Sequence, residues 1–120
     1  MIRAYELMVI YNGDTDEAVV NENLAGVARQ VEAGNGRIAT TDRWGRRRFA
    51  YQIDHKWEGI YIVLEIVTEA TDLHEVERNL RLADEVVRHK LIRLPDREAA
   101  KRGLLGDATP VEAAAAPPES

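Results

Sequence analysis

The chain of 120 residues contains no cysteine. This absence excludes a disulfide framework, a thiolate zinc site and a cysteine nucleophile, and it favours a cytosolic over a secreted protein. Long apolar runs are missing as well, since no stretch approaches the roughly 20 apolar residues that a membrane-spanning helix needs. Arg3 and Glu6 interrupt the N-terminal segment, so we expect no signal peptide.

Proline is scarce, and it is confined to the last stretch, 95–120. This stretch has few large apolar side chains, so it cannot bury enough surface to offset the entropy of ordering, and we expect a flexible, disordered tail. Residues 97–102 have the composition of a short helix that Gly103 would end, but such a helix needs a partner to be stable. The sequence therefore predicts one domain over residues 1–94, without internal repeats.

The first third of the chain follows the pattern of a strand and then a helix. Residues 3–10 are rich in β-branched and aromatic side chains and precede a turn sequence at 12–14, which predicts a strand. After an acidic start at 14–17, one helical stripe is formed by Val20, Leu24, Val27, Ala28 and Val31. The glycines of the segment 34–36 predict the end of this helix.

The next segment, 37–53, changes the parity of its apolar residues. They stand first at even and then at odd positions: Ile38 and Trp44, then Phe49, Tyr51 and Ile53. A strand keeps one face across such a change only with an inserted residue, and Gly45 marks the place for a bulge. A tight hairpin at Trp44 and Gly45 is the competing interpretation.

Three more elements complete the domain. Residues 60–67 are almost continuously apolar, which predicts a central strand. Thr71 and Asp72 predict the start of a second helix. Residues 86–94 predict a final strand. The inward-facing residues of that helix are expected to be Leu73, Val76, Leu80 and Ala83.

The order of these elements predicts a ferredoxin-like α+β fold, a βαββαβ sandwich. In this fold a four-stranded antiparallel sheet carries both helices on one face. The other face is left without helices, although several strands are apolar on both faces. The apolar residues on this uncovered face must therefore be buried by some other contact.

Charge is segregated along the chain, although the net charge is only -5. The two helical regions are acidic: 14–34 has five acidic residues and one basic, and 69–85 has six and two. In contrast, 37–56 has six basic and two acidic residues, and 86–94 has three basic and none acidic. A basic sheet that also carries aromatic residues is a candidate nucleic-acid surface, since arginine suits phosphate. Protection of a sheet edge is the alternative.

The sequence offers no catalytic or cofactor motif. His55, His74 and His89 lack metal-ligand spacing, and no phosphate-binding glycine loop, nucleophile elbow or dinucleotide fingerprint is present. We therefore expect neither an enzyme nor a bound cofactor or metal. The spaced aromatics of RNA-recognition domains are absent too, so base stacking is not expected to be the main mode of binding.

Three segments carry a further signal: 3–6, then 45–53 followed by 59–61, and 80–88. Together they resemble a known family, the bacterial small-subunit ribosomal protein six. The most specific part is a glycine, three arginines and then, after Phe49, the run Ala50 to Ile53. The family usually has leucine where Phe49 stands and a basic or small residue where Asp54 stands.

The resemblance implies a fold and a role. The fold is ferredoxin-like with one long bulged second strand, which favours the bulge at Gly45. The role is that of a structural constituent of the small ribosomal subunit, which pairs with the small basic ribosomal protein eighteen and binds the central domain of small-subunit ribosomal RNA during assembly. A cytoplasmic, ribosome-associated protein is implied, with no membrane and no small-molecule substrate as partner.

The family's contacts are transferred here as hypotheses. The RNA-binding candidates are Arg46, Arg47, Arg48, Arg81 and Arg88, with Arg3, Lys90 and Arg93 as weaker additions. The partner-facing candidates are Tyr5, Phe49 and Tyr51, and a place in the core is the alternative for each. Two other functions stay open: a small ferredoxin-like enzyme or ligand-sensing domain that dimerises through its sheet, and a general protein-interaction module with incidental basic strands.

Overall fold

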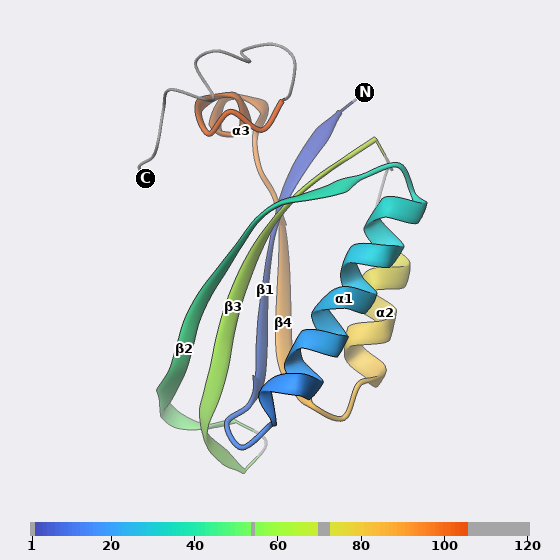
Figure 1. The fold of residues 1–120 in the computed structure, drawn as a ribbon. Coiled ribbons are helices and arrows are strands. Elements are labelled where there is room, and N and C mark those ends of the chain that lie inside the picture. The colour runs from blue at the N-terminus through green and yellow to red at the C-terminus, as the bar shows by residue number, and fades with distance from the viewer. Residues whose placement is uncertain (1, 54, 70–72, 106–120) are drawn as a thin grey trace.

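The computed structural model describes residues 2–53, 55–69 and 73–105. In these ranges the chain forms a four-stranded antiparallel sheet with the strand order β2-β3-β1-β4. The elements are β1 (Arg3–Asn12), α1 (Glu17–Ala33), β2 (Arg37–Ile53), β3 (Lys56–Thr68), α2 (His74–Leu82), β4 (Val86–Arg93) and α3 (Asp96–Lys101). Helices α1 and α2 cover the same face of the sheet (Figure 1), which is the predicted ferredoxin-like arrangement. No described helix is long and apolar enough to cross a membrane.

The main core lies between the sheet and the helices α1 and α2. Side chains alternate along a strand, so every second residue of β1 and β3 points into this core, and the register pairs Leu7 with Leu64 and Val9 with Ile62. The helices contribute residues at the predicted spacing: Val20, Val27 and Val31 from α1, and Val76 and Leu80 from α2, after a buried Leu73. Thr71 and Asp72, the predicted start of α2, lie outside the described residues.

Strand β2 is one long strand, and the predicted bulge is confirmed. Its register with β3 shifts between Arg43 and Gly45, and Gly45 has a φ of 86°, a conformation that favours glycine. A second shift, between Ile38 and Thr40, was not predicted. It moves the rest of the strand to the opposite parity, so Ile38 packs against the main core whereas Trp44 and later aromatic residues lie on the other face. The expectation that these residues share one face is therefore wrong for Ile38.

Helix α3 packs on the other face of the sheet, at one end (Figure 1). It follows Pro95, and the chain leaves it at Gly103, which has a φ of 74°. A second, smaller core is formed by Ala4, Val67, Leu94, Ala99 and Leu104. The sheet is thus the partner that this short helix needs, and packing continues through Leu105, past the boundary expected at residue 94. The remainder of the expected tail, 106–120, lies outside the described residues.

Candidate nucleic-acid interface

The sheet face opposite α1 and α2, the open face, carries a cluster of aromatic rings at the end far from α3. Tyr61 stands at the centre of this aromatic cluster. Its ring is parallel to that of Trp44 within 6°, at a centroid distance of 6.1 Å, and it meets Phe49 edge-on at 6.2 Å. Phe49 is buried because Gly59 leaves room for it: a Cβ at Gly59 would lie 2.7 Å from Phe49 Cζ. Close packing of β2 on β3 therefore builds this cluster.

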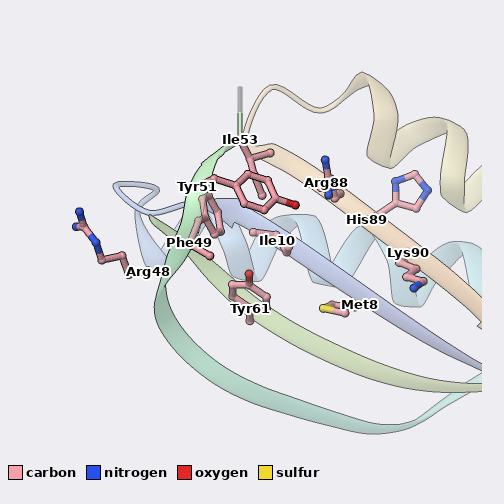
Figure 2. A pocket seen from close by; sticks show the side chains of 11 residues that line it. Met8, Ile10, Arg48, Phe49, Tyr51, Ile53, Tyr61, Arg88, His89 and Lys90 are labelled. Carbon is pink, nitrogen blue, oxygen red and sulfur yellow. The ribbon is translucent and has the colours of Figure 1, made fainter. Parts of the chain in front are cut away.

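Next to the aromatic cluster the open face is hollowed into a pocket of about 310 Å³ (Figure 2). Its apolar lining comes from three strands: Met8, Ile10, Phe49, Tyr51, Ile53 and Tyr61. Exposed cations also line it, namely Arg48 from β2 and Arg88 and Lys90 from β4. Arg88 is paired with Ile10 and Lys90 with Met8, so these cations stand beside the apolar lining on the same face of the sheet. The pocket thus combines an apolar lining with a cationic rim.

The three consecutive arginines of β2 make three different contacts. The guanidinium of Arg47 lies 5.9 Å from the centre of the Trp44 ring, and that of Arg48 lies 5.2 Å from the Trp57 ring. Arg46 turns to the loop after β1, where its Nε donates to the Gly13 carbonyl oxygen at 2.9 Å. Stacking uses the face of a guanidinium and leaves its N–H edge for other acceptors, so Arg47 and Arg48 are better placed for phosphate than Arg46.

The other basic candidates lie in different parts of the molecule. Arg81 lies in the last turn of α2, in the helix layer, where a cation complements the helix dipole. Arg3 lies at the start of β1 with a buried Nε, and Arg93 is 3.8 Å from Asp96. The structure therefore places Arg48, Arg88 and Lys90 at the pocket and Arg47 beside the aromatic cluster, and it does not bring Arg3, Arg81 or Arg93 to them.

The aromatic candidates have three different environments. Tyr5 is 6% exposed and belongs to the main core beneath the helices, so we do not carry it forward as a partner contact. Phe49 lies in the aromatic cluster beneath the pocket. Tyr51 is 65% exposed and presents its ring beside the pocket (Figure 2). Trp44 and Tyr61 were not among the transferred contacts. The sequence shows Trp44 as an aromatic residue of the basic strand, and the register of β2 on β3, which pairs Gly45 with Tyr61, brings the two rings together.

Three carboxylates converge on Arg102 where α3 meets the open face. Its Nε donates to Glu98 and its Nη1 to Glu65, both at 2.8 Å, and Nη1 lies 3.5 Å from Glu6. The hydrogen bond to Glu98 is the main reason why the pKa of Arg102 is raised and that of Glu98 is lowered. This network holds α3 on the sheet. Within the described ranges, no group of three or more His, Cys, Asp or Glu side chains is arranged to hold a metal ion.

The fold and the open face define a small ferredoxin-like α+β domain. Comparison with known proteins identifies its kind, because residues 4–93 match the model of the family described as ribosomal protein S6. The chain belongs to this family, which confirms the resemblance seen in the three sequence segments.

Relatives and a solved structure agree with this assignment. The chain is 41% identical over 92 residues to small ribosomal subunit protein bS6 of Salinispora arenicola, covering 77% of this chain and 96% of that protein. It is 39% identical over 102 residues to the bS6 of Saccharopolyspora erythraea, covering 83% and 86%. The crystal structure of 30S ribosomal protein S6 from Thermotoga maritima matches with a TM-score of 0.76 and 29% identity, covering 88% of this chain and 99% of that one.

Membership of the family establishes the class of function. The chain is a structural protein of the small ribosomal subunit, ribosome-associated and cytoplasmic, and the expectation that it is not an enzyme is confirmed. The predicted ferredoxin-like fold is confirmed as well.

Proposed function

We propose that the chain binds small-subunit ribosomal RNA through the open face of its sheet, together with ribosomal protein eighteen. The observation that carries this proposal is the pocket with its apolar lining and cationic rim, at the end of the open face that α3 leaves uncovered. An apolar surface of this kind is typical of a protein interface, and cations beside it are typical of phosphate binding.

The pocket itself suits the protein partner. Met8, Ile10 and Phe49 lie at the level of the sheet, and the exposed ring of Tyr51 extends the apolar surface outward. An apolar side chain inserted there would form the kind of desolvated anchor that dominates binding energy at interfaces. The partner that the resemblance implies is basic, and the net charge of -5 favours its association.

The cations around the pocket suit the RNA. Arg47, Arg48, Arg88 and Lys90 are exposed and lie on neighbouring parts of the surface, so a phosphate backbone that follows the edge of the docked partner can contact several of them. The central domain of the RNA is the region that the family resemblance implies.

The test compares two double variants with the same change in net charge. Arg47→Ala with Arg48→Ala removes two cations beside the open face, whereas Arg29→Ala with Arg78→Ala removes two exposed cations from α1 and α2. Binding to a central-domain RNA fragment, in the presence of ribosomal protein eighteen, is measured over a series of salt concentrations. We expect the first variant to bind more weakly and to lower the slope of log affinity against log salt by about 1 to 2.

The control variant is expected to leave affinity and slope almost unchanged. Arg78 is 3.7 Å from Glu75, but an ion pair this exposed contributes little to stability. Equal effects of the two double variants would refute a localised RNA surface. The partner site is tested separately with Tyr51→Ala, which should weaken binding of protein eighteen without RNA by about fivefold or more, since the ring is exposed and its loss spares the fold. Unchanged affinity would refute that site.

A further inference from the structure

Trp44 is a rigid aromatic platform on the molecular surface. It is 44% exposed, yet three contacts fix its ring. One face is stacked with Tyr61, its Nε1–H donates to Asp42 Oδ2 at 3.0 Å, and the Arg47 guanidinium lies over the ring. A side chain held in this way loses little entropy when a ligand covers it, so its exposed surface is preorganised for binding.

The bulge in β2 is the reason why this indole is exposed. The register skips Trp44 between the pairs formed by Arg43 and Gly45, so Trp44 is the extra residue of the bulge. Gly45 beside it has a φ of 86°, and apart from its chain neighbours no atom of the described residues lies within 4 Å of the place that a Cβ would take. The chain therefore turns a large apolar side chain outward, and 44% of its surface stays exposed beside Tyr61 and Arg47.

We propose that Trp44 stacks against one unpaired base of ribosomal RNA. This inference rests on the proposed function and names a contact within it. A nucleobase matches the site because it is flat, it stacks on indole regardless of sequence, and its own phosphates lie within reach of the cations on β2. A cationic side chain of a protein partner is the other natural occupant of an indole face, but the guanidinium of Arg47 already lies 5.9 Å from the centre of this ring, so a further cation is repelled there.

Trp57 supplies a matched comparison within the same chain. It is 45% exposed and has Arg48 over its ring, so the exposure and the neighbouring charge are alike. It lies at the end of the β2–β3 hairpin and lines a different pocket, with Gly13, Arg46 and Lys56. No ring in the described ranges is stacked against it, unlike Trp44, so we expect Trp57 to contribute less to base stacking.

The first experiment uses the full chain with Trp57→Phe, in which Trp44 is the sole tryptophan and its fluorescence reports on its ring alone. The protein is titrated at low salt with an octamer of adenosine nucleotides and with an octamer of the same backbone that lacks bases. Quenching by the first octamer and not by the second is expected. No quenching by either octamer, or equal quenching by both, would overturn the proposal.

The second experiment measures binding of the central-domain RNA fragment to Trp44→Leu, Trp44→Phe and Trp57→Leu. Loss of one stacked base should weaken binding of Trp44→Leu by about fivefold or more without changing the salt slope, because stacking releases no counterions. Trp44→Phe should retain most of the affinity, which excludes loss of the fold as the cause, and Trp57→Leu should have a smaller effect than Trp44→Leu.

The outcomes separate this inference from the proposed function. Unchanged RNA affinity of Trp44→Leu, with a reduced salt slope for the Arg47 and Arg48 variant, would refute the stacking site and leave the RNA surface standing. Weaker RNA binding of Trp44→Leu, with an unchanged salt slope for the Arg47 and Arg48 variant, would refute the electrostatic surface and leave the stacking site standing. A loss of affinity for protein eighteen without RNA, and none for RNA, would assign Trp44 to the protein partner and overturn the proposal.

Discussion

Gly59 lies where β3 passes the aromatic cluster, and replacing it with alanine tests whether the close approach of the strands is needed there. An added Cβ would lie 2.5 Å from Ile10 Cγ2 and 2.7 Å from Phe49 Cζ, and both of these side chains are buried. The Cγ2 atom is attached directly to the Cβ of Ile10, so it can move away only by a change of χ1, which is restricted in a β-branched side chain, or by a shift of β1. Gly59 does not have a positive φ, so the backbone itself accepts alanine and any loss of stability comes from packing.

The size of the effect follows from two opposing terms. Overpacking of a core costs about 1 to 3 kcal/mol, and the lower entropy of the unfolded alanine chain returns about 0.4 to 1 kcal/mol. We therefore expect Gly59→Ala to lower the free energy of unfolding by about 1 to 2 kcal/mol. In a domain of this size that corresponds to a fall in Tm of about 5 to 15 °C, measured by thermal and urea unfolding of the full chain.

Gly26→Ala in α1 is the control for this substitution. Its Cβ would meet only the mobile end of the Arg29 side chain, at 3.7 Å, so alanine should stabilise the helix by about 0.5 to 1 kcal/mol. Phe49→Leu removes the Cζ atom with which the new Cβ of Gly59→Ala would clash. The double variant should therefore lose about 1 kcal/mol less of the free energy of unfolding than the sum of the two single variants. A Tm of Gly59→Ala within about 2 °C of the parent, or strict additivity in the double variant, would refute the packing argument.

Two further predictions concern buried and paired polar groups. Tyr11 is fully buried, its hydroxyl donates to Asn23 Oδ1 at 2.6 Å, and burial raises the pKa of the phenol further above neutral pH, so the donor stays protonated. Tyr11→Phe should therefore lower the free energy of unfolding by about 1 kcal/mol, measured by urea unfolding. An unchanged midpoint would contradict this. Arg102→Ala should release α3 and speed hydrogen exchange at the amides of Ala99 and Leu104, whereas the control Lys101→Ala should not. The pKa of Glu98 is lowered in the folded chain, so this protection should be complete above the ordinary pKa of a glutamate and should be lost as the pH falls through the lowered pKa of Glu98. Protection that does not change with pH, or that still changes with pH in Arg102→Ala, would refute the role of the Glu98–Arg102 pair.

Local pattern predicted the backbone well where each element depends on its own residues. The spacing of Val20, Val27 and Val31 predicts α1 because a helix has a fixed period, and a change of parity beside Gly45 predicts the bulge because only an inserted residue can produce it. The shift between Ile38 and Thr40 involves no glycine, so no residue marks it in the sequence. The faces assigned in the first part of β2 were wrong for that reason.

The site depends on contacts between distant parts of the chain, which the sequence does not display. Arg48 is readable as a basic residue of β2, but Arg88 reaches the same pocket only because β4 pairs with β1 in a particular register. The docking of α3 likewise depends on Ala4 and Val67, which lie far from it along the chain. Composition therefore revealed the charges and rings, and the sheet topology alone decided which of them meet.

The position of α3 has a practical consequence for handling the protein. The described chain starts at Ile2 and ends at Leu105 beside the smaller core, at the end of the sheet remote from the β2–β3 hairpin (Figure 1). An affinity tag, a dye or a surface linker fused at either terminus is attached by way of that remote end. Immobilised in this way, the molecule would direct its hairpin half into solution, so titrations can be run on a sensor chip without the attachment point obstructing the ligand.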